Sequence, residues 1–104
     1  MELEKRSNPR LDFGILVYCN GRRAMTKDIS ASGTFVAKDE YHKQLAPLGS
    51  DVALSFDFPT TEDSLDAIGT VMHHGKDGEG MGIWFKRIDD RTKEFMKMFV
   101  SDRL

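Results

Sequence analysis

The stretch Phe13-Gly14-Ile15-Leu16-Val17-Tyr18-Cys19-Asn20-Gly21 decides the fold class, because a β-rich apolar run ends in the dipeptide Asn20-Gly21. Asn-Gly between two such runs is a strong hairpin signal, since both residues tolerate the positive φ angles of a two-residue turn. The return strand is expected over residues 22–27, and Asp28-Ile29-Ser30 follows it directly. The first regular element along the chain is therefore expected to be an antiparallel hairpin.

Four more short strands are expected downstream, at residues 33–37, 51–58, 65–74 and 81–85. The stretch 51–58 alternates apolar and polar residues with a period of two, which is typical of a half-buried strand. The segment 38–50 indicates a loop, and the glycine-rich segment 75–80 indicates a hairpin loop between the last two strands. Six short strands are thus expected in all.

The C-terminal segment changes period. From Ile88 to Phe99 apolar residues recur every three or four positions, which is typical of an amphipathic helix. We expect this helix over residues 88–102, capped by Asp89 or Asp90. Six short strands and one terminal helix predict an all-β fold, a six-stranded antiparallel barrel closed at one end by a C-terminal α-helix.

The bulk composition fits one globular domain over residues 1–104, with 39% apolar and 31% charged residues. A formal net charge of −2 argues against general binding to nucleic acid. Cys19 is the only cysteine, so we expect no disulfide framework and a reducing, cytoplasmic compartment. No apolar run is long enough to span a membrane, and residues 1–10 lack the apolar centre of a signal peptide. We therefore expect no membrane insertion.

Two short patterns flank the first hairpin, namely Arg6-Ser7-Asn8-Pro9-Arg10 and Asp28-Ile29-Ser30-Ala31-Ser32-Gly33. Guanidinium groups bind phosphates bidentately and stack on purine faces. A carboxylate accepts hydrogen bonds from the Watson–Crick N–H groups of guanine. Pro9 favours extended geometry at the residue before it, so the two arginines can reach different faces of one ligand. Together the patterns offer the groups that hold a guanine nucleotide with more than one phosphate.

The spacing Arg-x-x-x-Arg at 6 and 10, followed by Asp-x-Ser-x-x-Gly from 28 to 33, resembles the signature of the PilZ-domain family. The resemblance continues through Gly69-Thr70-Val71, Met81-Gly82-Ile83-Trp84-Phe85 and the expected helix, and it covers residues 5–100. It implies a six-stranded barrel over residues 12–86 and a mobile arm over residues 1–11. It also implies a receptor for the bacterial second messenger cyclic di-GMP, which is a ligand and not a cofactor, and it implies no enzymatic activity.

The resemblance assigns a role to each motif residue. Arg6 and Arg10 are expected to hold phosphates and stack on guanine. Asp28 is expected to accept from the N1 and N2 hydrogens of guanine. Ser30 is expected to bond a phosphate or a backbone group, and Gly33 to let the chain approach the ligand closely. Ordering the arm costs about 1–2 kcal/mol per residue, which several charge-assisted hydrogen bonds of about 1.5–3 kcal/mol offset. The arm is therefore expected to order only around a polyanion.

Two further residues are candidates for ligand contact. Lys5 directly precedes the first motif and is a candidate for contacting a second, stacked ligand molecule. His73 lies in the strand expected at 65–74, and it is either a stacking partner for guanine or a surface histidine. His73 and His74 are not expected to form a metal pair, because adjacent strand residues point to opposite faces. We expect no metal site and no catalytic constellation.

The leading interpretation is a non-enzymatic sensor that orders its arm on cyclic di-GMP and signals to an unidentified effector protein. Acting in trans as a monomer, it is expected to serve motility, secretion, polysaccharide (biofilm) or transcription machinery. The alternative is a ligand-independent protein-interaction domain with the same barrel, although the intact motifs weigh against it. A third interpretation, a small barrel that binds single-stranded nucleic acid, is disfavoured by the net charge of −2.

Overall fold

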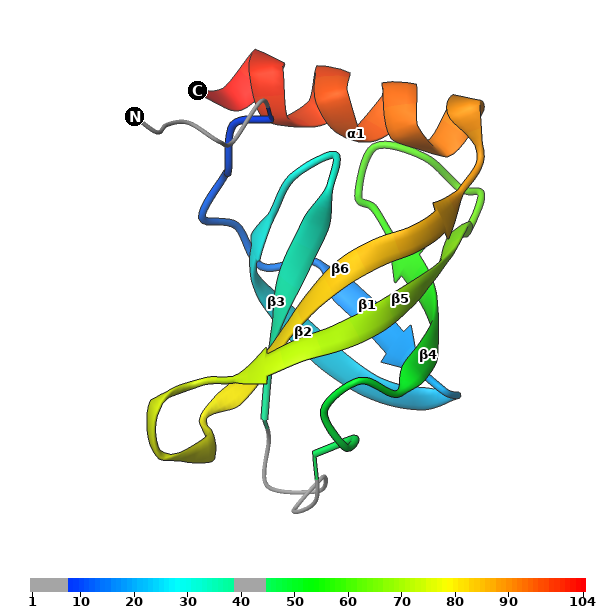
Figure 1. The fold of residues 1–104 in the computed structure, drawn as a ribbon. Coiled ribbons are helices and arrows are strands. Elements are labelled where there is room, and N and C mark those ends of the chain that lie inside the picture. Colours follow the sequence, from blue (N-terminus) through cyan, green and yellow to red (C-terminus); the bar gives the residue numbers. More distant parts are fainter. Residues whose placement is uncertain (1–7, 39–44) are drawn as a thin grey trace.

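In the computed structural model, which describes residues 8–38 and 45–104, six antiparallel strands form a closed barrel. The strands are β1 (Leu16–Cys19), β2 (Arg22–Ile29), β3 (Gly33–Ala37), β4 (Asp51–Asp57), β5 (Leu65–His74) and β6 (Gly80–Ile88). Their order around the barrel is β1-β2-β3-β6-β5-β4, and β1 pairs with β4 to close it. The helix α1 (Asp90–Arg103) lies across one end of the barrel (Figure 1). The fold class predicted from the sequence is confirmed.

The first hairpin turns where the sequence predicts. Asn20 has a φ angle of 52° and Gly21 a φ angle of 83°, as a two-residue turn with two left-handed residues requires. The strands that it joins pair in register from Leu16 opposite Met25 to Cys19 opposite Arg22. The dipeptide therefore fixes the register of the first two strands.

The first strand is shorter than the expected run 13–19, and the reason is a buried threonine. The Oγ1 atom of Thr26 accepts from the backbone N–H of Ile15 at 2.8 Å and donates to the carbonyl of Phe13 at 2.8 Å. The Thr26 hydroxyl takes the place of part of the backbone ladder here, while the N–H of Thr26 still donates to the carbonyl of Ile15 at 3.0 Å. Regular pairing begins only at Leu16. The Thr26 hydroxyl thus fixes the segment that precedes β1 against the interior face of β2.

Other boundaries differ by smaller amounts. β2 continues past residue 27 to Ile29, so Asp28 belongs to a strand and not to a turn. β4 ends at Asp57, one residue before the expected end at Phe58. β6 runs from Gly80 to Ile88, beyond both ends of the expected strand 81–85. The hairpin loop between β5 and β6 contains one short 3₁₀ turn, Lys76–Gly78.

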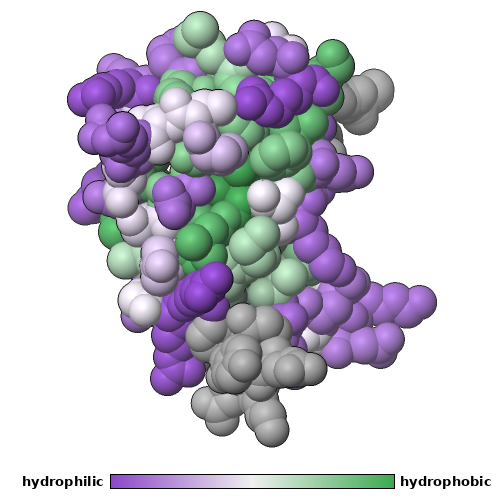
Figure 2. Space-filling model, turned by 180° about the vertical axis from the view of Figure 1, so that it is seen from behind, coloured by the Kyte–Doolittle hydropathy of each residue, from purple (hydrophilic) through white to green (hydrophobic). Residues whose placement is uncertain are grey.

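The core fills the barrel and continues beneath α1. Phe58 is fully buried, and its ring centroid lies 5.0 Å from that of Phe95 and 4.9 Å from that of Phe99. The ring of Phe13 meets Phe99 edge-on at 5.5 Å. Asp89 caps the helix by accepting from the N–H of Thr92 at 2.7 Å, as one of the two expected capping residues. Seen from behind, the surface over α1 carries mainly hydrophilic side chains (Figure 2).

Candidate ligand-binding site

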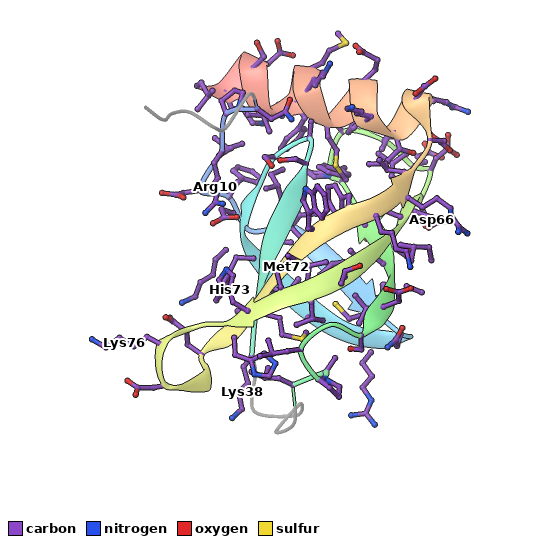
Figure 3. All side chains as sticks on the ribbon, in the orientation of Figure 1. Arg10, Lys38, Asp66, Met72, His73 and Lys76 are labelled. Carbon is purple, nitrogen blue, oxygen red and sulfur yellow. The ribbon has the colours of Figure 1, made fainter. Side chains whose placement is uncertain are left out.

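Four of the motif residues and one secondary candidate line a single hollow on the outside of the barrel. These residues are Arg10, Asp28, Ser30, Gly33 and His73. The hollow has a volume of about 440 Å³ and lies over β3 and the neighbouring ends of β2, β5 and β6. Figure 3 shows Arg10 and His73 on the same side of the barrel. Lys5 and Arg6 lie outside the residues that the structure describes.

Arg10 is positioned by the residue that follows it. Leu11 is buried and forms an isolated bridge with Ile29, with both backbone N–H···O distances at 2.9 Å. The N–H of Phe13 also donates to the carbonyl of Lys27 at 3.2 Å. Leu11, expected as the last residue of the arm, is thus paired with the barrel. Because the backbone of Leu11 is fixed in this way, the preceding residue Arg10 is held at the edge of the hollow.

A β-bulge turns Asp28 toward the hollow. Thr26 pairs with Val36 and Asp28 pairs with Phe35, so Lys27 has no partner in the β2–β3 register. Ala24 and Thr26 face the barrel interior, and simple alternation would also place Asp28 there. The extra residue shifts the alternation, so that Ile29 is buried and Asp28 faces outward. The bulge is therefore the local device that places this carboxylate in the site.

The Asp28 carboxylate uses its two oxygens differently. Oδ1 accepts from the backbone N–H of Phe35 at 3.2 Å. Oδ2 faces the guanidinium of Arg10, with an Nη1–Oδ2 distance of 3.4 Å. The side chain of Asp28 is 15% exposed and that of Arg10 is 47% exposed, so solvent screens this ion pair. One oxygen is thus held by the backbone, while the other has a partner that can be exchanged.

Ser30 shapes the turn between β2 and β3. Its Oγ accepts from the backbone N–H groups of Ser32 at 3.1 Å and of Gly33 at 3.2 Å. The backbone N–H of Ser30 donates to the carbonyl of Gly33 at 2.9 Å. Of the two roles expected for Ser30, these contacts correspond to the backbone one. The side chain of Ser32 lies against it, with an Oγ–Oγ distance of 3.1 Å.

Gly33 lies where the backbones of β3 and β6 approach closely. A Cβ atom at this position would collide with the carbonyl oxygen of Ile83. Gly33 pairs directly with Trp84 in the β3–β6 register. Only a residue without a side chain fits here, and the floor of the hollow at this point is bare backbone.

His73 reaches the hollow through a second bulge. Val71 pairs with Ile83 and His73 pairs with Gly82, which leaves Met72 as the extra residue of β5. The imidazole lies over Gly82, where a Cβ would collide with the ring. Its centroid is 5.9 Å from that of Phe35, with an interplanar angle of 37°. The exposed imidazole therefore lies close against the sheet, over Gly82 and beside the ring of Phe35.

Sequence reasoning missed several residues of the hollow, namely Ser32, Phe35, Met72 and Trp84. Three of them could have been found. Trp84 lies between the buried residues Ile83 and Phe85, so strand alternation places its indole outside. Ser32 lies within the second motif, and its place there could have marked it as a candidate. Met72 follows the buried Val71 on β5, so the same alternation places its side chain outside.

The remaining candidates lie apart from the hollow. The Nε2 atom of His74 lies 2.7 Å from the carbonyl oxygen of Ala46, away from His73. Burial raises the pKa of the Cys19 thiol to about 11, so this side chain is a poor nucleophile. Within residues 8–38 and 45–104, no three His, Cys, Asp or Glu side chains gather as a metal site. In the same ranges, no helix has the length and apolar character needed to cross a membrane.

The described part of the chain is thus a closed antiparallel β-barrel domain with Arg10 and residues of the second motif on one outer face. The family model of the PilZ domain matches residues 4–102, and the chain therefore belongs to the PilZ domain family. PilZ domains are cyclic di-GMP receptor and adaptor domains, not enzymes. No curated protein sequence matches this chain.

Among solved structures, the chain is similar to that described as "Structure of Bacillus subtilis Inhibitor of motility (MotI/DgrA)". The TM-score is 0.83 at 17% sequence identity, and the match covers 97% of this chain and 51% of that protein. This chain therefore spans about half the length of the Bacillus protein. At this level of identity the likeness shows the fold alone.

Proposed function

We propose that this chain is a cyclic di-GMP receptor whose ligand occupies the hollow beside Asp28. The observation that carries the proposal is that Arg10, Asp28, Ser30, Gly33 and His73 line one hollow. Arg10 and Asp28 are 18 residues apart in the sequence, and the first hairpin and the Leu11–Ile29 bridge bring their side chains into contact. Membership of the PilZ domain family supports the choice of ligand.

Binding proceeds by an exchange of partners at Asp28. Oδ1 stays on the backbone of Phe35 and keeps the carboxylate in place, while Oδ2 leaves Arg10 and accepts from guanine. The guanidinium that is released turns to a phosphate of the ligand, where a bidentate contact forms. Arg6 provides the second guanidinium, according to its motif position. His73 offers its exposed ring face to a guanine base.

The output of the receptor is a changed surface at the N-terminal arm. Residues of the arm close over the ligand, and the new surface is recognised by an effector protein. We place this activity in the cytoplasm of a bacterium, because the single cysteine is a free thiol and suits a reducing compartment. The receptor acts as a monomer in the control of motility or biofilm formation.

NMR spectroscopy of the labelled chain tests this proposal against its alternatives. Cyclic di-GMP, GMP and a short oligonucleotide are added separately. We expect amide shifts at Arg10, Asp28, Gly33 and His73 for cyclic di-GMP, and much smaller ones for GMP. Unchanged spectra with cyclic di-GMP would instead support the ligand-independent interaction domain. Shifts with the oligonucleotide alone would support a nucleic-acid-binding barrel.

A further inference from the structure

Two large apolar side chains lie exposed at one edge of the proposed ligand site. Trp84, the only tryptophan of the chain, is 58% exposed, and Met72 is 56% exposed. Both line the hollow that contains Asp28 and Arg10. Figure 3 shows Met72 on the sheet face that also carries His73. Neighbouring exposed apolar side chains of this size are typical of a binding surface.

The strand register shows where the indole stands. Trp84 pairs with Gly33 on β3 and with Thr70 on β5, so one lateral neighbour has no side chain. Asp28 lies on β2, the strand beyond β3. Asp28 pairs with Phe35, which is two residues along β3 from Gly33, the partner of Trp84. The backbones of Trp84 and Asp28 are therefore two strand spacings, about 10 Å, apart across the sheet and offset by two residues, about 7 Å, along it. An aromatic ring of the ligand can lie over Gly33 beside the indole, with its polar edge directed along the sheet toward the carboxylate.

We propose that Trp84 is a further ligand-binding residue, which stacks on a purine base of the dinucleotide while Met72 completes the apolar wall. The inference rests on the proposed function, because it deepens the same site. Base–aromatic stacking contributes substantially to affinity and accepts any base. Trp84 therefore supplies affinity, whereas Asp28 selects guanine.

The polar groups of the hollow favour a purine over an apolar protein segment as the occupant. The β2 side of the hollow carries the Asp28 carboxylate and its partner, the Arg10 guanidinium. An apolar segment covering the hollow would remove this ion pair from water without adding hydrogen bonds to either group, which is costly. A nucleobase has one apolar face for the indole and a polar edge for the carboxylate. Such a ligand fits both the apolar and the charged parts of the hollow.

Intrinsic fluorescence of the full chain gives a direct test, since all tryptophan emission comes from Trp84. Cyclic di-GMP is titrated into the protein while calorimetry measures binding independently. We expect quenching of the emission with the same midpoint as the calorimetric curve. Calorimetric binding with unchanged emission would overturn the role of Trp84 and leave the proposed function standing. Absence of calorimetric binding would overturn both.

Affinity measurements on three variants separate stacking from a structural role. Trp84→Ala is expected to weaken binding at least fivefold, and Trp84→Phe to restore affinity to within about threefold of the parent, because both aromatic rings stack. Tyr18→Ala is the matched control, since Tyr18 is 40% exposed on β1 and lies outside the hollow. Its affinity is expected to equal that of the parent. Equal affinities of Trp84→Ala and the parent, or loss in Trp84→Phe as large as in Trp84→Ala, would contradict stacking.

Discussion

The guanidinium of Arg10 and the carboxylate of Asp28 are paired across the mouth of the ligand site, with 3.4 Å between Nη1 and Oδ2. The contact joins the two sequence motifs, which are 18 residues apart in the chain. It is long for a charge-assisted hydrogen bond and lies partly in solvent. The pair is thus easily opened, and both groups are available to a ligand that satisfies them better.

Replacing Arg10 by alanine is expected to separate binding from stability. The exposed pair contributes at most about 1 kcal/mol, so the free energy of unfolding changes little. Affinity for cyclic di-GMP should fall at least tenfold, because a charge-assisted contact of about 1.5–3 kcal/mol is lost. Calorimetry and urea denaturation measure the two effects. Arg10→Lys serves as the control for charge alone, and its full retention of affinity would argue against a bidentate phosphate contact.

Gly33→Ala tests the close approach of β3 to β6. The new Cβ would meet the carbonyl oxygen of Ile83, and backbone on both strands must shift to make room. Overpacking of this kind costs about 1–3 kcal/mol in the free energy of unfolding. Gly14→Ala is the matched control, because its nearest contact is the flexible end of Met25 at 3.3 Å. Equal stability of the two variants in denaturant would show that the strands are not so closely packed.

Thr26→Val tests the side-chain link that replaces the start of the first strand. The valine has a similar shape, but it leaves the N–H of Ile15 and the carbonyl of Phe13 without their partner. Unpaired buried polar groups predict a loss of about 1–3 kcal/mol in the free energy of unfolding. Thr70→Val, which removes only an exposed contact to Asp51, is the comparison. A loss of stability no greater than that of Thr70→Val would rule out the structural role of the Thr26 hydroxyl.

The helix cap at Asp89 predicts a pH dependence of stability. Hydrogen bonds from Thr92 lower the pKa of Asp89 below its ordinary value. A lowered pKa in the folded state means that the stabilisation is present above the ordinary pKa and is lost as the pH falls through the folded-state pKa. Asp89→Ala is expected to lower the melting temperature by a few degrees at neutral pH. Thermal unfolding down to about pH 2 should show this difference narrowing; a constant difference would contradict the assignment.

Much of the barrel could be predicted because its signals are local. Asn20-Gly21 specified a turn with two positive φ angles, and the structure has both. The residues of β3 and β5 were predicted with the observed ends, since glycine-rich and polar segments bound them. The start of β1 was not predictable, because it depends on a side-chain contact with Thr26 on another strand.

The candidate site was only partly predictable for a related reason. Composition and spacing identified the groups in the motifs, but the outward direction of Asp28 and His73 depends on the bulges at Lys27 and Met72. A bulge is a property of two paired strands, and the sequence of a single strand does not reveal it. The outward positions of Met72 and Trp84, by contrast, follow from ordinary strand alternation.

Isothermal titration calorimetry with cyclic di-GMP on the parent and on Asp28→Ala tests the central claim most directly. Removal of this carboxylate deletes the guanine acceptor and leaves Phe35 N–H, on a partly buried strand, without its side-chain partner. The parent is expected to bind, and Asp28→Ala is expected to bind at least tenfold more weakly, with circular dichroism confirming that it is folded. No binding by the parent, or equal affinity of a folded Asp28→Ala, would contradict the account.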